Sequence, residues 1–227
     1  MPTIGESIQV WVVPLVGQTA ERWRLLLSPA EWAKAMRFRF AADQVRSAVT
    51  RGVLRTLLGR YLSVDPLALE FSENEFGKPA VPGIEFNASH SGDYALLAFS
   101  ACARVGIDVE HRRGNRVVAD LALRVLTPAE YQRFMALAEV DHERTFFDIW
   151  ALKESVLKGI GSGLSVPPED IEISFYPSSP RLLSANTPEV RDISDWTIQS
   201  LDIGDTAYAA ALAVEHPAPH IELNHFE

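Results

Sequence analysis

The same short patterns occur twice along this chain of 227 residues, in the same order. Ser28-Pro-Ala-Glu31 returns as Thr127-Pro-Ala-Glu130. Each copy has a hydroxyl residue that can cap a helix, proline at the first helical position and glutamate at the third, which together form a capping box. Repetition at a fixed interval, here roughly 100 residues, means that one chain holds two similar units. The fold must therefore accommodate a duplicated unit.

Three further pairs of segments keep the same order. They are residues 63–72 with 165–174, residues 93–99 with 206–213, and a predicted strand at 8–13 with 105–110. We expect the two units to join between Ser100 and Arg104. The sequence thus predicts an N-terminal subdomain over residues 1–102 and a C-terminal subdomain over residues 103–227.

Each unit is predicted to run from a strand through helices to further strands. Apolar residues recur at three- and four-residue spacing after Asp43, which predicts a long amphipathic helix. A second long helix is predicted at about 141–159, and short strands at 94–100, 171–175, 196–201 and 208–214. Because the strands do not alternate strictly with helices, the pattern favours an α+β fold over a doubly wound α/β fold.

The charge of the chain is unevenly distributed. The net charge of −9 argues against a nucleic-acid partner. Residues 21–60 carry nine basic and three acidic side chains, whereas residues 139–227 carry five basic and sixteen acidic ones. Two interpretations stay open: solvated helix faces, or a basic surface that meets an anionic ligand or an acidic partner.

Several features predict a cytoplasmic protein without a membrane partner. The first residues show no basic segment followed by an apolar run, so we expect no signal peptide. The longest apolar stretch, residues 94–103, is shorter than the roughly 18 residues that cross a bilayer. The single cysteine, Cys102, excludes an internal disulfide framework and is predicted to be buried. His111 and His142 are predicted to lie on the surface.

The first candidate site is the segment Gly106-Ile-Asp108-Val-Glu110. Residues two apart on a strand point to the same face, so Asp108 and Glu110 can direct two carboxylates at one point while Ile107 and Val109 enter the core. Carboxylate oxygens suit Mg²⁺. The alternative is an ordinary exposed strand end.

The second candidate site is the segment Trp150-Ala-Leu-Lys153-Glu154-Ser-Val-Leu-Lys158. Glu154 and Lys158 are four apart and share a helix face, with Trp150 one turn earlier. Glu154 could add a third carboxylate, and the lysines could bind phosphate oxygens. The alternative is a surface ion pair of little energetic value.

The third candidate combines Gly77-Lys78-Pro79 with Asn87-Ala-Ser89-His90-Ser91-Gly92. It gathers hydrogen-bond donors beside a glycine, where backbone can approach an anion closely. The alternative is an ordinary turn. Gly159-Ile-Gly161-Ser-Gly163 lacks the Gly-Lys-Ser/Thr ending of a phosphate loop and predicts a helix stop instead.

In this order, the three motifs resemble those of the Sfp-type 4′-phosphopantetheinyl transferases, over residues 28–167. The resemblance implies an α+β pseudo-dimer of two similar subdomains. It implies an enzyme that transfers 4′-phosphopantetheine from coenzyme A to a serine hydroxyl of an apo acyl- or peptidyl-carrier protein. The other product would be 3′,5′-ADP, and the reaction would depend on Mg²⁺.

The resemblance also assigns residues. Asp108, Glu110 and Glu154 would hold Mg²⁺ on the diphosphate of coenzyme A. Lys158 would contact that diphosphate, with Lys153 close by. Glu154, Lys158 and Asp108 would be the catalytic residues. Glu154 would accept the serine proton, either directly or through metal-bound water.

The remaining coenzyme A contacts would come mainly from the first subdomain. They are Ser89 and His90 for phosphate groups, Lys34 and Arg46 for the 3′-phosphate, and Lys78 and Pro79 of the Gly-Lys-Pro motif. A third basic position of the family falls on Glu31, which predicts a rearranged phosphate grip.

We expect a monomer with one active site in the cleft between the halves. The first half has Trp11 and Val13 where the second has Asp108 and Glu110, so it cannot build a carboxylate site. Its helix carries Arg51, Arg55 and Arg60, a predicted basic wall for an acidic carrier. Two other functions stay open: another Mg²⁺-dependent nucleotide or sugar-diphosphate transferase, and a non-catalytic module that binds carrier proteins.

Overall fold

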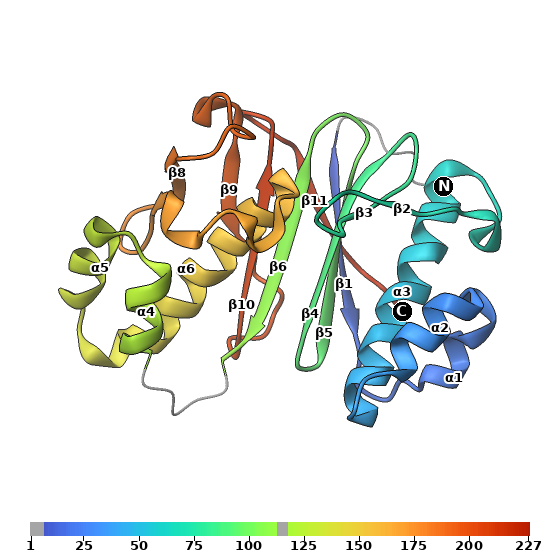
Figure 1. Cartoon of the computed structure of the whole chain (residues 1–227). Coiled ribbons are helices and arrows are strands. Elements are labelled where there is room, and N and C mark those ends of the chain that lie inside the picture. Colours follow the sequence, from blue (N-terminus) through green and yellow to red (C-terminus); the bar gives the residue numbers. More distant parts are fainter. Residues whose placement is uncertain (1–6, 113–117) are drawn as a thin grey trace.

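Two units of mixed helix and strand lie side by side in the computed structural model, which describes residues 7–112 and 118–227 (Figure 1). The segment considered for a signal peptide begins at residues 1–6, outside the described residues. The first unit contains β1 (Ile8–Pro14), α1 (Ala20–Trp23), η1 (Arg24–Leu26), α2 (Pro29–Met36), α3 (Ala41–Leu62), η2 (Pro66–Ala68), β2 (Ser72–Glu73), β3 (Pro79–Ala80), β4 (Glu85–Ser91) and β5 (Tyr94–Ser100). The η elements are short 3₁₀ helices.

The second unit repeats this order. It contains β6 (Val105–His111), α4 (Ala119–Val125), α5 (Pro128–Met135), α6 (Glu139–Ile160), η3 (Gly163–Ser165), η4 (Pro168–Asp170), β7 (Ile171–Ser174), β8 (Arg181–Ala185), η5 (Ile193–Asp195), β9 (Thr197–Ser200) and β10 (Tyr208–Val214). A last strand, β11 (Ile221–His225), returns to the first unit. The predicted α+β class and duplicated architecture are therefore confirmed.

Two main sheets form the centre of the molecule. The first has strand order β11-β1-β5-β4, in which β11 pairs parallel to β1 and the other pairs are antiparallel. The second has order β6-β10-β9 and is antiparallel. Strands β4 and β6 meet where the units join (Figure 1), and the side chain of Asn87 on β4 accepts a hydrogen bond of 2.9 Å from the backbone of Ile107 on β6. This junction places side chains of both units at one site.

An apolar cluster fills the space between the two sheets. It includes Val10 from β1, Leu96 from β5, Ile107 from β6 and Leu212 from β10, all buried. Helix α3 packs behind the first sheet and α6 behind the second (Figure 1). Because side chains alternate along a strand, the residues of β6 that do not enter this cluster face α6.

The two long helices agree with the sequence pattern. Helices α3 and α6 each have 22 residues and begin within two residues of the predicted positions. Both capping boxes form, at Ser28 with Glu31 and at Thr127 with Glu130. Helix α6 ends at Gly161, whose positive φ of 78° is easiest for glycine, as the predicted helix stop requires.

Close packing of α6 on β6 depends on Gly106. A Cβ atom at this position would lie 2.0 Å from the backbone oxygen of Ser155 and 2.2 Å from the backbone nitrogen of Gly159. A larger residue would therefore push the helix away from the strand. The glycine brings Glu154 and Lys158 on the helix toward Asp108 on the strand.

The prediction that Cys102 is buried was wrong, whereas His111 and His142 are partly exposed and each stacks on an aromatic ring. Cys102 is exposed because β5 ends at Ser100, so this last part of the apolar stretch lies in the tight connection between β5 and β6. His111 stacks on Tyr208 with ring centroids 4.6 Å apart, and His142 stacks on Phe134 at the same distance.

Within the described residues, no helix has the length and apolar character needed to span a membrane.

Candidate active site

Strand β6, strand β4 and helix α6 bring the predicted catalytic residues together at the junction of the units. Asp108 on β6 is only 1% exposed. Its Oδ1 accepts a hydrogen bond of 2.8 Å from Ser89 on β4 and lies 2.5 Å from Lys158 Nζ on α6. Lys158 Nζ also donates to Ser89 Oγ at 2.9 Å. The structure therefore brings these three side chains together.

Glu110 follows Asp108 on the same face of β6. Its Oε1 accepts a hydrogen bond of 3.1 Å from Trp150 Nε1, and its Oε2 accepts one of 3.3 Å from Ser91 Oγ. No contact with Glu110 was predicted for either partner, although Ser91 is one of the donors of the third candidate site. The spacing could have indicated both, since Trp150 lies one turn before Glu154 and Ser91 lies two residues after Ser89.

The three carboxylates repel one another. Burial, and then the charge of Asp108, raise the pKa of Glu110. Burial raises the pKa of Glu154 too; the charges of Asp108 and Glu110 add to this rise, while Lys158 opposes it. The second oxygen of Asp108, Oδ2, is buried and has no hydrogen-bond partner among the described residues. The site therefore has more negative charge than Lys158 can balance.

These features fit a cation. The residues provide hard oxygen donors, one of which is buried and unpartnered, and a cation would relieve their repulsion. In the side-chain positions described, however, no group of three or more His, Cys, Asp or Glu residues is arranged to hold a metal ion. Lys158 already occupies Oδ1 of Asp108, and Trp150 and Ser91 hold Glu110.

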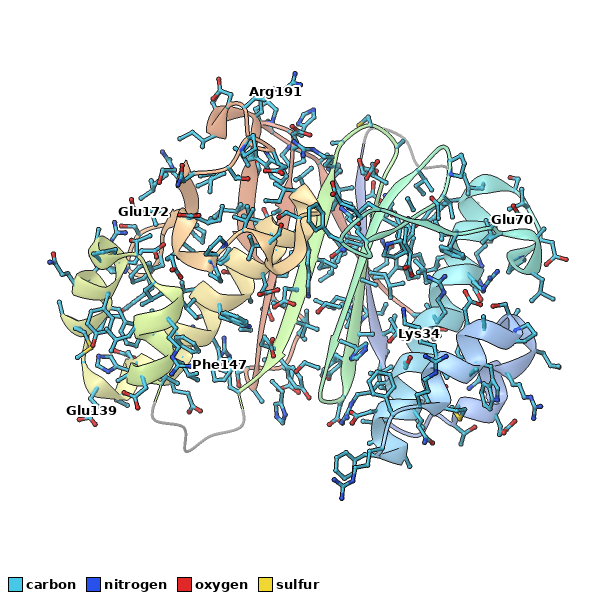
Figure 2. All side chains as sticks on the ribbon, in the orientation of Figure 1. Lys34, Glu70, Glu139, Phe147, Glu172 and Arg191 are labelled. Atoms are coloured by element: carbon cyan, nitrogen blue, oxygen red, sulfur yellow. The ribbon has the colours of Figure 1, made fainter. Side chains whose placement is uncertain are left out.

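A cavity of about 580 Å³ lies in the first unit, with His90 and Ala88 of β4 in its wall. Its other lining residues are Ser28, Ala30, Glu31, Lys34, Ser47, Thr50, Arg51, Leu54, Arg55, Phe71, Glu73, Gly77 and Pro79. Lys34 and Pro79, two of the predicted coenzyme A contacts, thus share this cavity with His90. Figure 2 shows Lys34 on the first unit.

His90 links the cavity with the carboxylate site. His90 is an exposed residue, but partial burial of its imidazole lowers its pKa, as do the charges of Lys158 and Arg46. Arg46 donates from Nε to the backbone oxygen of Gly92 at 2.7 Å and pairs with Asp43 at 2.7 Å. His90 thus lines the cavity and is affected by the charge of Lys158, whereas Arg46 is not among the residues that line the cavity.

Glu31 is paired with two arginines. It accepts hydrogen bonds from Arg51 Nε at 2.5 Å and Arg55 Nε at 2.8 Å, and from the backbone of Ser28 at 2.7 Å. Burial alone would raise the pKa of Glu31, but these hydrogen bonds lower it to about 2. The acidic residue at this position is therefore ionised and already compensated.

Lys153 does not lie near the active site, contrary to the prediction. Its side chain is completely buried inside the second unit, where Nζ lies 2.6 Å from Glu130. It also donates to the backbone oxygens of Val125 and Pro168, both at 2.9 Å. Successive residues on a helix point about 100° apart, so Lys153 and its neighbour Glu154 face different surroundings. Its ammonium group belongs to the core.

Lys78 also differs from the prediction. Its ammonium group donates to the backbone oxygens of Val105 at 3.3 Å and Gly159 at 3.1 Å, in the second unit. Neighbouring Asn74 donates to the backbone oxygen of Gly161 at 2.8 Å. The charge of Lys78 therefore ties the two units together, while the adjacent residues Gly77 and Pro79 line the cavity.

Aromatic side chains occupy the corresponding place in the first unit. Trp11, the counterpart of Asp108, donates from Nε1 to the hydroxyl of Tyr61 at 2.8 Å. Phe226, just after β11, packs edge-on against Trp11 with ring centroids 6.2 Å apart. This face of α3 therefore cannot form a second carboxylate site.

Comparison with known proteins agrees with this geometry. One family model, for the 4′-phosphopantetheinyl transferase superfamily, matches residues 104–213, and another, for the N-terminal part of 4′-phosphopantetheinyl transferases, matches residues 18–102. The 4′-phosphopantetheinyl transferase HetI of Nostoc sp. is 33% identical over 219 residues, covering 93% of this chain and 89% of HetI. The chain belongs to the 4′-phosphopantetheinyl transferase superfamily.

Other relatives carry similar names. The transferase is 28% identical to the 4′-phosphopantetheinyl transferase Sfp of Bacillus subtilis over 207 residues, covering 90% of this chain and 89% of Sfp. A solved holo-[acyl-carrier-protein] synthase of Thermotoga maritima aligns with 49% of this chain and 62% of its own, at 24% identity and a TM-score of 0.39. The predicted family and enzyme class are confirmed: the protein is an enzyme that transfers 4′-phosphopantetheine.

Proposed function

We propose that the transferase moves 4′-phosphopantetheine from coenzyme A to a serine hydroxyl of an apo acyl- or peptidyl-carrier protein, in a reaction that depends on Mg²⁺ and releases 3′,5′-ADP. One observation carries this proposal. Lys158 joins Ser89 and Asp108 across the junction of the units, beside a cavity whose wall carries one lysine, two arginines and two glutamates. An anionic nucleotide in that cavity would place its diphosphate near Lys158.

The metal would be held by Asp108, Glu110 and Glu154. When bound, it would supply positive charge to the diphosphate of coenzyme A. Lys158 is positioned to donate to the same diphosphate, and this would strengthen as negative charge gathers on the leaving group. His90 would supply a further donor from β4, and Ser89 would contact phosphate by giving up the hydrogen bond that its hydroxyl donates to Asp108. Lys34 and Arg46 would contact the 3′-phosphate.

Glu154 is the proposed base for the serine proton. Its carboxylate is half-buried and its pKa is raised by burial and by the two neighbouring carboxylates. A raised pKa makes a carboxylate a better proton acceptor near neutral pH. The proton passes to Glu154 directly or through water. No residue of the protein has to form a covalent intermediate.

The carrier would meet a smaller basic surface than the sequence suggested. Arg51 and Arg55 are paired with Glu31, and the guanidinium of Arg60 lies 5.9 Å from the ring centroid of Phe226. Arg37 and Arg39, in the connection before α3, are exposed. They remain available to an acidic carrier, whose binding should weaken as salt rises. Cytoplasmic location and a monomeric state stay predictions.

One experiment tests the function directly. The protein is incubated with Mg²⁺, a fluorescent coenzyme A labelled on its thiol, and an apo carrier protein. Covalent labelling of the carrier serine is the expected result. Tight carrier binding without labelling would favour a non-catalytic module. Failure with coenzyme A but transfer from a sugar or nucleotide diphosphate would favour another class of transferase.

A further inference from the structure

Strand β4 directs alternate side chains to opposite sides of its sheet. Phe86 belongs to the core of the first unit, and His90 lines the cavity of that unit. Because side chains alternate along a strand, Asn87, Ser89 and Ser91 point the other way, toward the second unit. Asn87 and Ser89 are buried there. Burying polar groups costs free energy unless each has a hydrogen-bond partner.

The neighbouring strand shows that these polar residues are not needed for packing. On β5, Ala98 lies opposite Asn87 and Leu96 lies opposite Ser89. Opposite residues of an antiparallel pair share a face of the sheet. Ala98 and Leu96 both belong to the apolar cluster between the two sheets. An apolar face could thus have continued onto β4, so its polar residues call for another explanation.

The polar face of β4 meets the outer edge of β6. Among the described strands, β4 and β6 each end a sheet, so this edge of β6 presents its backbone groups to side chains instead of to a neighbouring strand (Figure 1). Oδ1 of Asn87 accepts a hydrogen bond of 2.9 Å from the backbone nitrogen of Ile107. Oγ of Ser91 accepts one of 3.1 Å from the backbone nitrogen of His111. Two side chains of β4 therefore set the register of β4 on β6.

The contact between the two units at the active site lies between these two hydrogen bonds. Ser89, midway between Asn87 and Ser91, donates to Asp108 at 2.8 Å and accepts from Lys158 at 2.9 Å. A shift of β4 by two residues would move Ser89 about 6.6 Å along β6. The register of the two strands therefore decides whether Ser89 reaches Asp108 and Lys158.

We infer that Asn87 is a positioning residue for the transfer reaction: its contact with the backbone of β6 holds Ser89 within reach of Asp108 and Lys158. The inference rests on the proposed function, in which these groups act at the diphosphate of coenzyme A. Within the described residues, the side chain of Asn87 makes one hydrogen bond, to the backbone of β6, and none to the carboxylates. Asn87 therefore acts through Ser89.

Asn87→Leu tests this role, because leucine has a similar size and no acceptor atom. The kcat of carrier labelling should fall about tenfold or more, since misplacing reacting groups by about 1 Å can cost a hundredfold in rate. The KM for coenzyme A should change little, because the cavity lies on the other side of β4. Calorimetric titration with 3′,5′-ADP counts the sites that still bind nucleotide. Turnover for each such site separates a positioning role from partial unfolding.

A double variant tests whether Asn87 acts through Ser89. Ser89→Ala removes the hydroxyl that Asn87 positions. In that background, Asn87→Leu should reduce turnover by a smaller factor than it does in the wild type, because the effects of coupled residues are not additive. Equal factors in the two backgrounds would overturn the positioning role. Asn87→Ala also removes the acceptor, and it gives the same comparison should the leucine variant not fold.

Asn224→Leu is the matched control. Asn224 on β11 also holds two strands together through its side chain, since its Nδ2 donates to Oε1 of Gln9 on β1 at 3.1 Å. This variant should keep normal turnover for each binding site. Normal turnover in Asn87→Leu, or an equal loss in both variants, would overturn the inference. If the wild-type protein labels no carrier, the proposed function itself has failed.

Discussion

Arg55 in the first unit and Lys153 in the second occupy equivalent places. Arg55 pairs with the capping-box residue Glu31 at 2.8 Å and donates to the backbone oxygen of Pro66. Lys153 pairs with the capping-box residue Glu130 at 2.6 Å and donates to the backbone oxygen of Pro168. The repeat has thus conserved within one chain a buried contact between a helix start, a long helix and the turn after it.

Lys153 should therefore matter for stability rather than for coenzyme A. Lys153→Met leaves Glu130 buried without its cation and should destabilise the fold by about 3–5 kcal/mol, as measured by urea unfolding. The double variant Lys153→Met, Glu130→Gln no longer buries an unpaired carboxylate, so it should regain part of the lost stability. The folded fraction should bind coenzyme A normally. Selective loss of coenzyme A affinity in a stable variant would return Lys153 to the active site.

Asp108 should show the reverse behaviour. Asp108→Asn removes a charge that raises the pKa of both Glu110 and Glu154, so the melting temperature should stay the same or rise. Transfer activity should be abolished. Glu139→Gln serves as control, since Glu139 is exposed at the outer edge of the second unit (Figure 2). Near-normal turnover by Asp108→Asn at limiting Mg²⁺ would contradict the proposed site.

Mg²⁺ should stabilise the protein in a pH-dependent manner. The pKa values of Glu110 and Glu154 are raised in the fold, so their contribution to stability is greatest at low pH and is lost as pH rises through the raised values. A cation removes the repulsion between the ionised groups. Mg²⁺ should raise the melting temperature near neutral pH, and this shift should shrink in acid and vanish in Asp108→Asn. An equal shift in the variant would place the ion elsewhere.

Glu31 should contribute stability in the opposite pH range. Its pKa falls from 4.5 to about 2 on folding, so its contribution is complete above pH 4.5 and is lost as pH falls toward 2. The usual conversion of such a pKa shift gives about 3.4 kcal/mol, and solvent screening of the partly exposed carboxylate makes the actual contribution smaller. Urea unfolding of wild type and Glu31→Gln should show a constant difference from neutral pH to about pH 5 and a smaller one at pH 4. A difference independent of pH would contradict the ion pairs.

The transferase should act as a monomer with one nucleotide site. Trp11 and Tyr61 fill the first unit's counterpart of the carboxylate site, and the second unit supplies the interface that a dimer would otherwise form. Sedimentation should give a mass of 25.2 kDa, and calorimetry should give one coenzyme A for each chain. A stable dimer or two equivalent sites would contradict this expectation.

The repeat, the long helices and the residues proposed for the carboxylate site could all be predicted from local sequence patterns. These features are local: the capping boxes, the three- and four-residue spacing of α3 and α6, and the alternation that puts Asp108 and Glu110 on one face of β6. Short-range geometry fixes such relations whatever the surroundings. The segments that carry these motifs then come into contact because Gly106 allows α6 to pack closely on β6.

Tertiary structure decided which partner each charged side chain takes. Lys78 and Lys153 bind backbone oxygens and a buried carboxylate, and Glu31 binds two arginines from another helix. Strand β11 crosses back to pair with β1, more than 200 residues away in sequence. A long charged side chain can adopt several conformations. Because burying an unpaired charge costs free energy, it adopts the conformation that gives it a partner. That choice depends on segments far away in the chain, which no local pattern describes.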